Sequence, residues 1–230
     1  MLTLNQLQVS IGKKKILEDV SLHVKQQEIV ALIGHNGAGK STTFNTVLGL
    51  HRLQAGTILL NGKVLHNLTT TSIVKEGLGL VPQLNNVFGN LSVEENLELG
   101  SVVSQESNPT FTAEKIYEIF PILKERRRQL VGTMSGGQRQ MVAIGIGLMS
   151  NPSYLLLDEP TVGLQPSFVD KVMEQIVKVN KDYGISILII EQNINKVLDI
   201  ADRVYVMSRG SIIKEFVPEE ISSDELWQLL

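Results

Sequence analysis

The 230-residue sequence contains no cysteine and no strong excess of charge of either sign. Without cysteine, the chain has no disulfide framework, no Cys-ligated zinc or iron–sulfur centre and no catalytic thiol. The 24 Asp and Glu residues nearly balance the 21 Lys and Arg residues, which gives a net charge of −3. A charge this small provides no general attraction to nucleic acid or to an anionic membrane surface, so no nucleic-acid partner is expected.

Long hydrophobic runs are also missing. Unbroken apolar stretches such as residues 187–190 are far shorter than the roughly 20 residues that a membrane-spanning helix needs. Residues 1–8 alternate between apolar and polar and lack the basic and apolar regions of a secretory signal peptide. The 43% of hydrophobic residues is enough for a large core. These features predict a soluble, intracellular protein with one large domain, or with one core and a sizeable insert.

Apolar strands alternate with helical segments along most of the chain. Residues 29–33 and 154–157 are continuous apolar runs, which are typical of strands covered on both faces. From about residue 85 to residue 150 the pattern becomes helical. Further helices are expected at 42–50, at 168–179 and at 218–230, the last with Trp227 and Leu230 turned inward, and a hairpin is expected at 57–65. The alternation predicts an α/β core with a parallel sheet, interrupted by a helical insert.

The first motif with chemical content is Gly34-x-x-x-x-Gly39-Lys40-Ser41, which follows an apolar strand and precedes a helix. In this setting the glycines let successive backbone N–H groups converge on a phosphate chain at the positive end of the helix. We expect the Lys40 ammonium to bridge the β- and γ-phosphates and the Ser41 hydroxyl to bind Mg²⁺. The sequence therefore predicts a nucleotide site formed by Gly34, His35, Asn36, Gly37, Ala38, Gly39, Lys40, Ser41 and Thr42.

The apolar strand at 154–157 ends in Asp158 and Glu159. An aspartate at this edge of the sheet, beside the phosphate loop, is placed to hold Mg²⁺ through water. Glu159 points in a different direction and is expected to be the general base for an attacking water. Taken alone, Asp-Glu-Pro is more often an ordinary strand exit, and the phosphate loop gives it weight. Two carboxylates with separate tasks indicate hydrolysis of the nucleotide.

The segment Met134-Ser135-Gly136-Gly137-Gln138 admits two interpretations. Ser135-x-x-Gln138 is a helix capping box, which is a common local feature, and consecutive glycines at a helix start also expose N–H groups to an anion. Several motifs occur here in one order: the phosphate loop, Gln83, this segment, Asp158-Glu159, and a final apolar strand ending in Glu191-Gln192. With this order the chain resembles the ATP-binding cassette (ABC) family of transport ATPases over nearly all of its length.

The resemblance implies a phosphate-loop NTPase fold with ATP and Mg²⁺ as cofactors. A single domain 1–230 would combine a RecA-like parallel-sheet core at 1–84 and 149–230, an antiparallel β subdomain, and an α-helical subdomain at about 85–148. Gln83 would reach Mg²⁺ and the attacking water. The signature residues Ser135, Gly136, Gly137 and Gln138 would hold the γ-phosphate of ATP bound to a second cassette, in a homo- or heterodimer. That head-to-tail pair would drive integral membrane permease subunits.

Three positions depart from the family pattern. The family usually stacks an aromatic residue on adenine near Ile11, where this chain offers only an aliphatic face to the base. Gln165 replaces an aspartate, and Gln192 stands where the family has its switch histidine. Such a subunit belongs either to a heterodimer whose partner carries the full set or to a subfamily that uses glutamine. We favour the second, with Gln192 as a catalytic γ-phosphate sensor, because the phosphate loop and Glu159 are intact.

Within the family, the chain most resembles the ATP-binding subunits of branched-chain amino acid importers, through residues 81–83, 92–97, 120–126 and 190–193. Residues 163–167 also resemble the urea importer ATPase. We therefore expect a subunit at the cytoplasmic face of the inner membrane that powers amino acid uptake, with an extracytoplasmic solute-binding protein as an indirect partner. Urea import is the alternative. A soluble cassette protein of translation or DNA maintenance is less well supported, because the chain has one cassette and no sustained heptads. The signature argues against a phosphate-loop kinase or GTPase.

Overall fold

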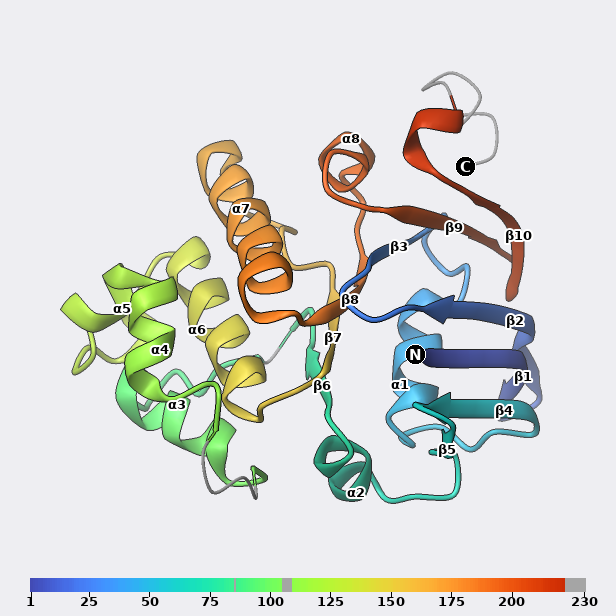
Figure 1. The fold of residues 1–230 in the computed structure, drawn as a ribbon, viewed down its shortest axis with the longest axis horizontal. Coiled ribbons are helices and arrows are strands. Elements are labelled where there is room, and N and C mark those ends of the chain that lie inside the picture. The colour runs from blue at the N-terminus through green and yellow to red at the C-terminus, as the bar shows by residue number, and fades with distance from the viewer. Residues whose placement is uncertain (85, 105–108, 222–230) are drawn as a thin grey trace.

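A mixed β-sheet runs through the molecule in the computed structural model, which describes residues 1–84, 86–104 and 109–221 (Figure 1). Its strands are β1 (Leu2–Ile11), β2 (Lys14–Val24), β3 (Ile29–Ile33), β4 (Ala55–Leu60), β5 (Lys63–Val64), β6 (Leu78–Val81), β7 (Tyr154–Asp158), β8 (Ser186–Ile190), β9 (Arg203–Ser208) and β10 (Ser211–Phe216). Their order across the sheet is β5-β4-β1-β2-β10-β9-β3-β8-β7-β6. Strands β9, β3, β8, β7 and β6 pair in parallel, whereas β1, β2, β4 and β5 pair antiparallel.

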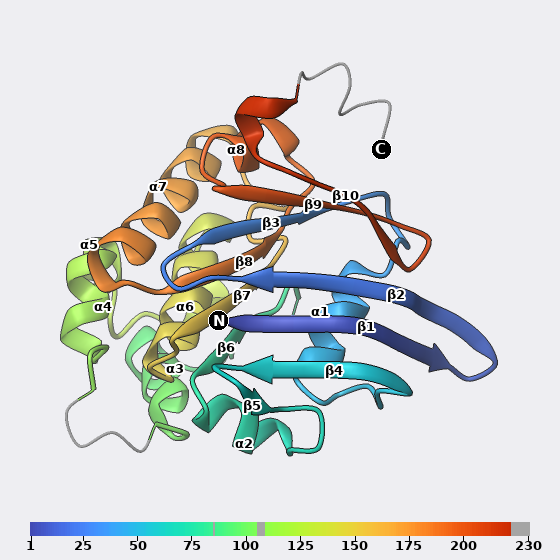
Figure 2. The same cartoon turned by 45° about the vertical axis from the view of Figure 1, so that its right-hand side comes forward.

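Helices cover both faces of the parallel strands. They are α1 (Lys40–Val47), α2 (Thr70–Lys75), α3 (Val93–Ser101), α4 (Ala113–Ile119), α5 (Pro121–Glu125), α6 (Gly136–Met149), α7 (Pro166–Tyr183) and α8 (Ile194–Leu198), with 3₁₀ turns at Val131–Thr133 and Pro218–Glu220. Helices α6 and α7 lie on one side of the sheet, next to α3–α5, whereas α1 lies between the parallel strands and β1, β2 and β4 (Figures 1 and 2).

Each face of the parallel strands has its own hydrophobic core. Ala31 of β3 and Leu157 of β7 belong to the core shared with helices α3–α8. Val30 and Leu156, their neighbours in the sequence, belong to the core shared with Phe44 of α1 and with β1, β2 and β4. All five are at most 1% exposed. Burial on both faces explains why residues 29–33 and 154–157 are continuously apolar.

The predicted α/β architecture is confirmed, and some bounds are corrected. Helix α1 begins at Lys40, two residues earlier than expected, because Gly39 is its N-cap. Helix α7 is longer than the expected 168–179, with Pro166 in its first turn. The helix expected at 218–230 is wrong for Pro218–Glu220, a 3₁₀ turn, and its remainder with Trp227 and Leu230 lies outside the described residues. The division into 1–84, 85–148 and 149–230 stays a prediction.

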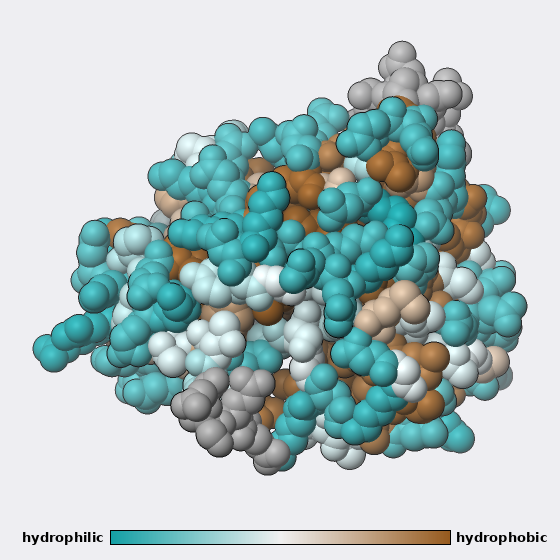
Figure 3. All heavy atoms as spheres, viewed as in Figure 1, coloured by the Kyte–Doolittle hydropathy of each residue, from teal (hydrophilic) through white to brown (hydrophobic). Residues whose placement is uncertain are grey.

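The surface carries no extended apolar belt on the face shown in Figure 3, where hydrophilic residues predominate and hydrophobic residues lie in separate patches. Among the residues that the structure describes, no helix combines the length and the hydropathy needed to cross a membrane.

Candidate functional site

The phosphate loop joins β3 to α1 at the carboxyl edge of the parallel strands. A Cβ at Gly34 would lie 2.1 Å from the Met207 carbonyl oxygen, so only glycine fits there. Gly39 is the N-cap of α1 with a φ of 112°, a left-handed conformation that glycine adopts readily. The Lys40 Nζ donates hydrogen bonds to the carbonyl oxygens of Gly34 at 2.6 Å and His35 at 3.0 Å. The loop therefore curls around the lysine side chain.

Two carboxylates lie close to this lysine. Lys40 is 5% exposed, and burial lowers the pKa of its ammonium while the charges of Glu159 and Asp158 raise it. The Ser41 Oγ donates to Asp158 Oδ1 at 3.3 Å. Burial and the nearby Glu159 charge raise the pKa of Asp158, against the opposing effects of the Ser41 hydrogen bond and Lys40. A cation placed at Asp158 would relieve the cost of this burial.

Glu159, at the end of β7, is held by two amides. It is 7% exposed, and its Oε2 accepts from Gln83 Nε2 at 2.5 Å and from Gln192 Nε2 at 2.7 Å. The three residues follow β6, β7 and β8, which are neighbours in the sheet. Glu159 has a φ of 48°, and its N–H donates to the Ile190 carbonyl at 2.9 Å. A left-handed non-glycine residue costs about 1 kcal/mol or more, and such strain is concentrated at functional sites.

Most of the predicted nucleotide-site residues line one hollow of about 510 Å³, whereas Gly34, His35, Ala38 and Asp158 lie outside its lining. The lining residues are Lys14, Ile16, Asn36, Gly37, Gly39, Lys40, Ser41, Thr42, Gln83, Glu159 and Gln192. Ile11, expected to contact the base, is 48% exposed at the β1–β2 turn and does not line this hollow. Lys14 and Ile16 of β2 do, and the sequence reasoning missed them. The sequence does place both residues close to Ile11, on the strand after the turn. In the structure Lys14 pairs with Ile11 across the hairpin, and Ile16 lies two residues further on.

The signature segment opens α6 and does not reach the hollow. Ser135 Oγ accepts from the Gln138 N–H at 3.4 Å, and Gln138 Oε1 accepts from the Ser135 N–H at 3.1 Å, which is a complete capping box. The capping interpretation is thus confirmed. None of Ser135, Gly136, Gly137 and Gln138 lines the hollow at the phosphate loop. Their expected contact with ATP stays a prediction, and it requires a second chain.

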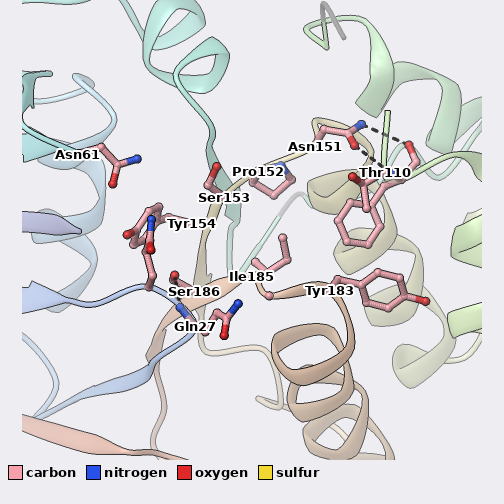
Figure 4. A pocket seen from close by; sticks show the side chains of 13 residues that line it. Gln27, Asn61, Thr110, Asn151, Pro152, Ser153, Tyr154, Tyr183, Ile185 and Ser186 are labelled. Carbon is pink, nitrogen blue, oxygen red and sulfur yellow. Dashed lines mark hydrogen bonds between the residues drawn. The ribbon is translucent and has the colours of Figure 1, made fainter. Parts of the chain in front are cut away.

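A second hollow of about 380 Å³ lies at the opposite, amino end of the parallel strands (Figure 4). It is lined by Tyr154 and Ser186, which are the first residues of β7 and β8. The Asn151 side chain in this hollow forms hydrogen bonds with the N–H and the carbonyl of Phe111. All of its lining residues are uncharged. It therefore offers no counter-charge to phosphates, and the hollow at the phosphate loop is the candidate site.

Comparisons with known proteins identify relatives of the whole chain. A family model described as ABC transporter matches residues 17–162. The chain is 42% identical over 213 residues to the high-affinity branched-chain amino acid transport ATP-binding protein BraG of Pseudomonas aeruginosa, covering 93% of this chain and 91% of BraG. It is 36% identical over 230 residues to the lipopolysaccharide export system ATP-binding protein LptB of Escherichia coli, covering 97% and 93%.

Solved structures of ABC transporter cassettes have a similar fold. The ADP conformation of MJ1267, an ATP-binding cassette of an ABC transporter, superposes with a TM-score of 0.84 at 28% identity, covering 99% of this chain and 93% of that one. A second MJ1267 structure gives a TM-score of 0.86 at 29% identity, covering 100% and 98%.

Proposed function

This chain belongs to the ABC transporter family, and from that premise we propose that it powers an importer of branched-chain or related amino acids. As a family member it is an ATP-binding transport ATPase. The importer proposal is supported by the 42% identity with BraG over 93% of the chain. The proposal that the chain hydrolyses ATP at this site rests on one geometric observation. The Glu159 carboxylate accepts hydrogen bonds from Gln83 and Gln192 beside the phosphate loop.

The phosphate loop is proposed to bind the triphosphate of ATP. Backbone N–H groups at the start of α1 carry a partial positive charge that favours an anion. Lys40 would exchange its hydrogen bonds to the Gly34 and His35 carbonyls for bonds to phosphate oxygens. The apolar side chains of Ile16 and Ile11 are the proposed contacts for the base.

The residues around Ser41 fit a Mg²⁺ ion that arrives with the nucleotide. The Ser41 hydroxyl, the Asp158 carboxylate and the Gln83 amide oxygen are the hard oxygen ligands that Mg²⁺ prefers. Asp158 forms no ion pair within the described residues, and burial raises its pKa, so a cation is favourable there. Among the residues that the structure describes, no cluster of three or more His, Asp or Glu side chains could hold a metal ion by itself. We therefore propose that phosphate oxygens of the nucleotide supply part of the Mg²⁺ coordination. When bound, the ion would neutralise charge that develops on the phosphates.

Glu159 is proposed to accept the proton of the attacking water. Glu159 follows a strand end beside Lys40, and two amides donate hydrogen bonds to its Oε2. These contacts hold the carboxylate in place before the substrate arrives. Gln83 and Gln192 each keep an amide oxygen that can orient the water. Neither amide titrates, so the arrangement does not depend on protonation of a switch histidine.

The complete site is proposed to need a second cassette, identical or not. Residues Ser135–Gln138 lie outside the hollow of their own chain, and the first N–H groups of α6 provide an anion-binding helix end. A head-to-tail pair would bring the α6 start of one cassette to the γ-phosphate bound by the other.

The proposed permease contact lies next to Gln83. Leu84 and Phe88 are 70% and 57% exposed, and large apolar side chains so close to the half-buried Gln83 amide suggest a partner surface. Binding there would link the permease directly to the Gln83–Glu159 hydrogen bond. The proposed location is therefore peripheral, on permease subunits at the cytoplasmic face of the inner membrane, with a solute-binding protein on the other side.

A transport assay tests the proposal. A strain that lacks the chain is complemented with the wild type or with Glu159→Gln, and uptake of labelled leucine, isoleucine and valine is measured. Only the wild type should restore uptake, because an amide cannot take up the water's proton. Restored urea uptake without amino acid uptake would instead support the urea importer. Restored export of lipopolysaccharide would support the function named for LptB, which the 36% identity favours as a second candidate.

A further inference from the structure

Glu191 is a buried carboxylate to which the mechanism above gives no role. It follows β8, it is 2% exposed, and it forms no ion pair within the described parts of the chain. Its Oε1 accepts from the Thr161 N–H at 2.9 Å and from the Thr161 hydroxyl at 2.5 Å. Its Oε2 accepts from the N–H groups of Gln192 at 2.9 Å and Asn193 at 3.2 Å. Four neutral donors, three of them from the backbone, thus surround one carboxylate.

These donors belong to the two loops that carry the hydrolytic residues. Thr161 lies two residues after Glu159, and Gln192 adjoins Glu191 in the sequence. Strands β7 and β8 are parallel neighbours with Asp158 opposite Ile190, so the two loops leave the sheet side by side. After the last paired residues of the two strands, the Glu159 N–H donates a hydrogen bond to the Ile190 carbonyl. Further along both loops, the Glu191 carboxylate links them by accepting hydrogen bonds from Thr161 and Gln192.

We propose that Glu191 is a positioning residue of the hydrolytic site. Its carboxylate fixes the loop of Glu159 against the loop of Gln192, and this keeps the Gln192 amide on the Glu159 carboxylate. The inference rests on the hydrolytic role proposed above for Glu159. A carboxylate is required because it accepts on both oxygens, whereas a glutamine would direct an NH₂ group at one of the two donor pairs. Glu191→Gln therefore keeps the shape of the side chain and breaks the bridge on one side.

The first test measures single-turnover ATP hydrolysis by the full chain, with protein in excess over MgATP. Glu191→Gln should hydrolyse about 30- to 100-fold more slowly, while its affinity for MgATP stays within about twofold, because the phosphate loop is untouched. The matched control is Glu28→Gln, a change at another well-shielded carboxylate that pairs with Arg203 away from the site. The control should lose stability and keep its single-turnover rate within about twofold.

The second test distinguishes positioning from a merely structural role. If Glu191 acts through Gln192, then adding Glu191→Gln to Gln192→Ala should slow hydrolysis by less than about fivefold more. Thr161→Val, which removes only the hydroxyl donor, should slow hydrolysis by about fivefold, and Thr161→Ser should restore the wild-type rate. These Thr161 variants keep the test valid if Glu191→Gln folds poorly.

Two results would overturn the proposal: a Glu191→Gln rate within threefold of wild type, or a full multiplicative loss in the Gln192→Ala background. Glu159→Gln is measured in parallel. If it hydrolyses ATP like the wild type, the assignment of the base fails; if it is inactive and Glu191→Gln is not, only the positioning role fails.

Discussion

Lys40 combines a structural and an electrostatic task in one side chain. Its ammonium closes the loop through the Gly34 and His35 carbonyls, and it lines the hollow proposed to hold the triphosphate. Lys40→Ala should weaken binding of MgATP by at least about a hundredfold, because the phosphates lose their main charge-assisted donor. Titration with a fluorescent ATP analogue measures this. Lys63→Ala, at an exposed lysine that pairs with Glu76, is the control and should bind normally. Micromolar affinity in the Lys40 variant would contradict the assignment.

Gln192 stands where the family resemblance led us to expect a histidine, and its position next to Glu159 suits the proposed role of a γ-phosphate sensor. Its amide is already hydrogen-bonded to Glu159 at 2.7 Å. Gln192→Ala should slow hydrolysis roughly ten- to a hundredfold, which corresponds to about 1.4–2.8 kcal/mol, and Gln192→His should be tolerated. ATP affinity should barely change.

The role of Gln192 is tested by single-turnover ATP hydrolysis in the assembled transporter. The catalytic base of the partner cassette is disabled, so that the measured rate comes only from the site that contains Gln192. An alanine variant as fast as the wild type would show that Gln192 is a bystander and that the site is degenerate.

At the scale of the element, the start of α6 has both a local and a functional interpretation, and they can be tested separately. Ser135 caps the helix through Gln138. Ser135→Asp keeps an equally good N-cap, so the free energy of unfolding should stay within about 0.5 kcal/mol of wild type. The added carboxylate would repel the γ-phosphate of the opposite cassette, so hydrolysis should fall at least about tenfold.

Urea unfolding and steady-state ATPase measurements on the same preparation check the two effects of Ser135→Asp. Ser135→Ala is the converse control: it should lose about 1 kcal/mol of stability through the missing cap. Full activity in the aspartate variant would leave Ser135 with its capping role alone.

Local chemistry explains which elements were predictable. Ser92-x-x-Glu95 has the spacing of a capping box in the sequence itself, and the structure contains that capping box at the start of α3. The extent of α7 was underestimated at both ends. Pro166 and Ser167 in its first turn are exposed and add nothing to the apolar pattern, whereas Tyr183, four residues after Val179, continues that pattern and was overlooked. Gly184, with a φ of 68°, caps the end of the helix.

At the scale of the whole molecule, the contacts that make the site were beyond sequence reasoning. The phosphate loop is one continuous segment, so the chain itself displays it. Gln83 and Glu159, by contrast, are 76 positions apart, and their hydrogen bond depends on β6 lying beside β7. The bridge from Glu191 to Thr161 likewise needs β7 and β8 in register. Hydrophobic alternation predicts a parallel core but not the order of its strands.

The antiparallel and parallel halves of the sheet are joined by a buried ion pair. Arg203, at the start of β9, is bonded to both oxygens of Glu28 at 2.9 Å, and it donates to Glu215 of β10 at 2.6 Å and to the His23 carbonyl of β2 at 2.8 Å. Burial alone would raise the pKa of Glu28, but the hydrogen bonds and charge of Arg203, together with the Lys25 N–H, hold that pKa below its usual value.

This network makes stability depend on pH in a defined direction. Because the pKa of Glu28 is lower in the folded state, its stabilising contribution is present above the usual pKa of glutamate and is lost as pH falls through the lowered value. Glu28→Gln should therefore cost about 1–2 kcal/mol at pH 7, less than a fully buried pair because Glu215 still contacts Arg203, and the difference from wild type should shrink toward zero in acid. Urea unfolding at pH 7 and near pH 3.5 measures both values. A difference that stays constant across this range would show that the shape of the side chain, rather than its charge, holds the two halves of the sheet together.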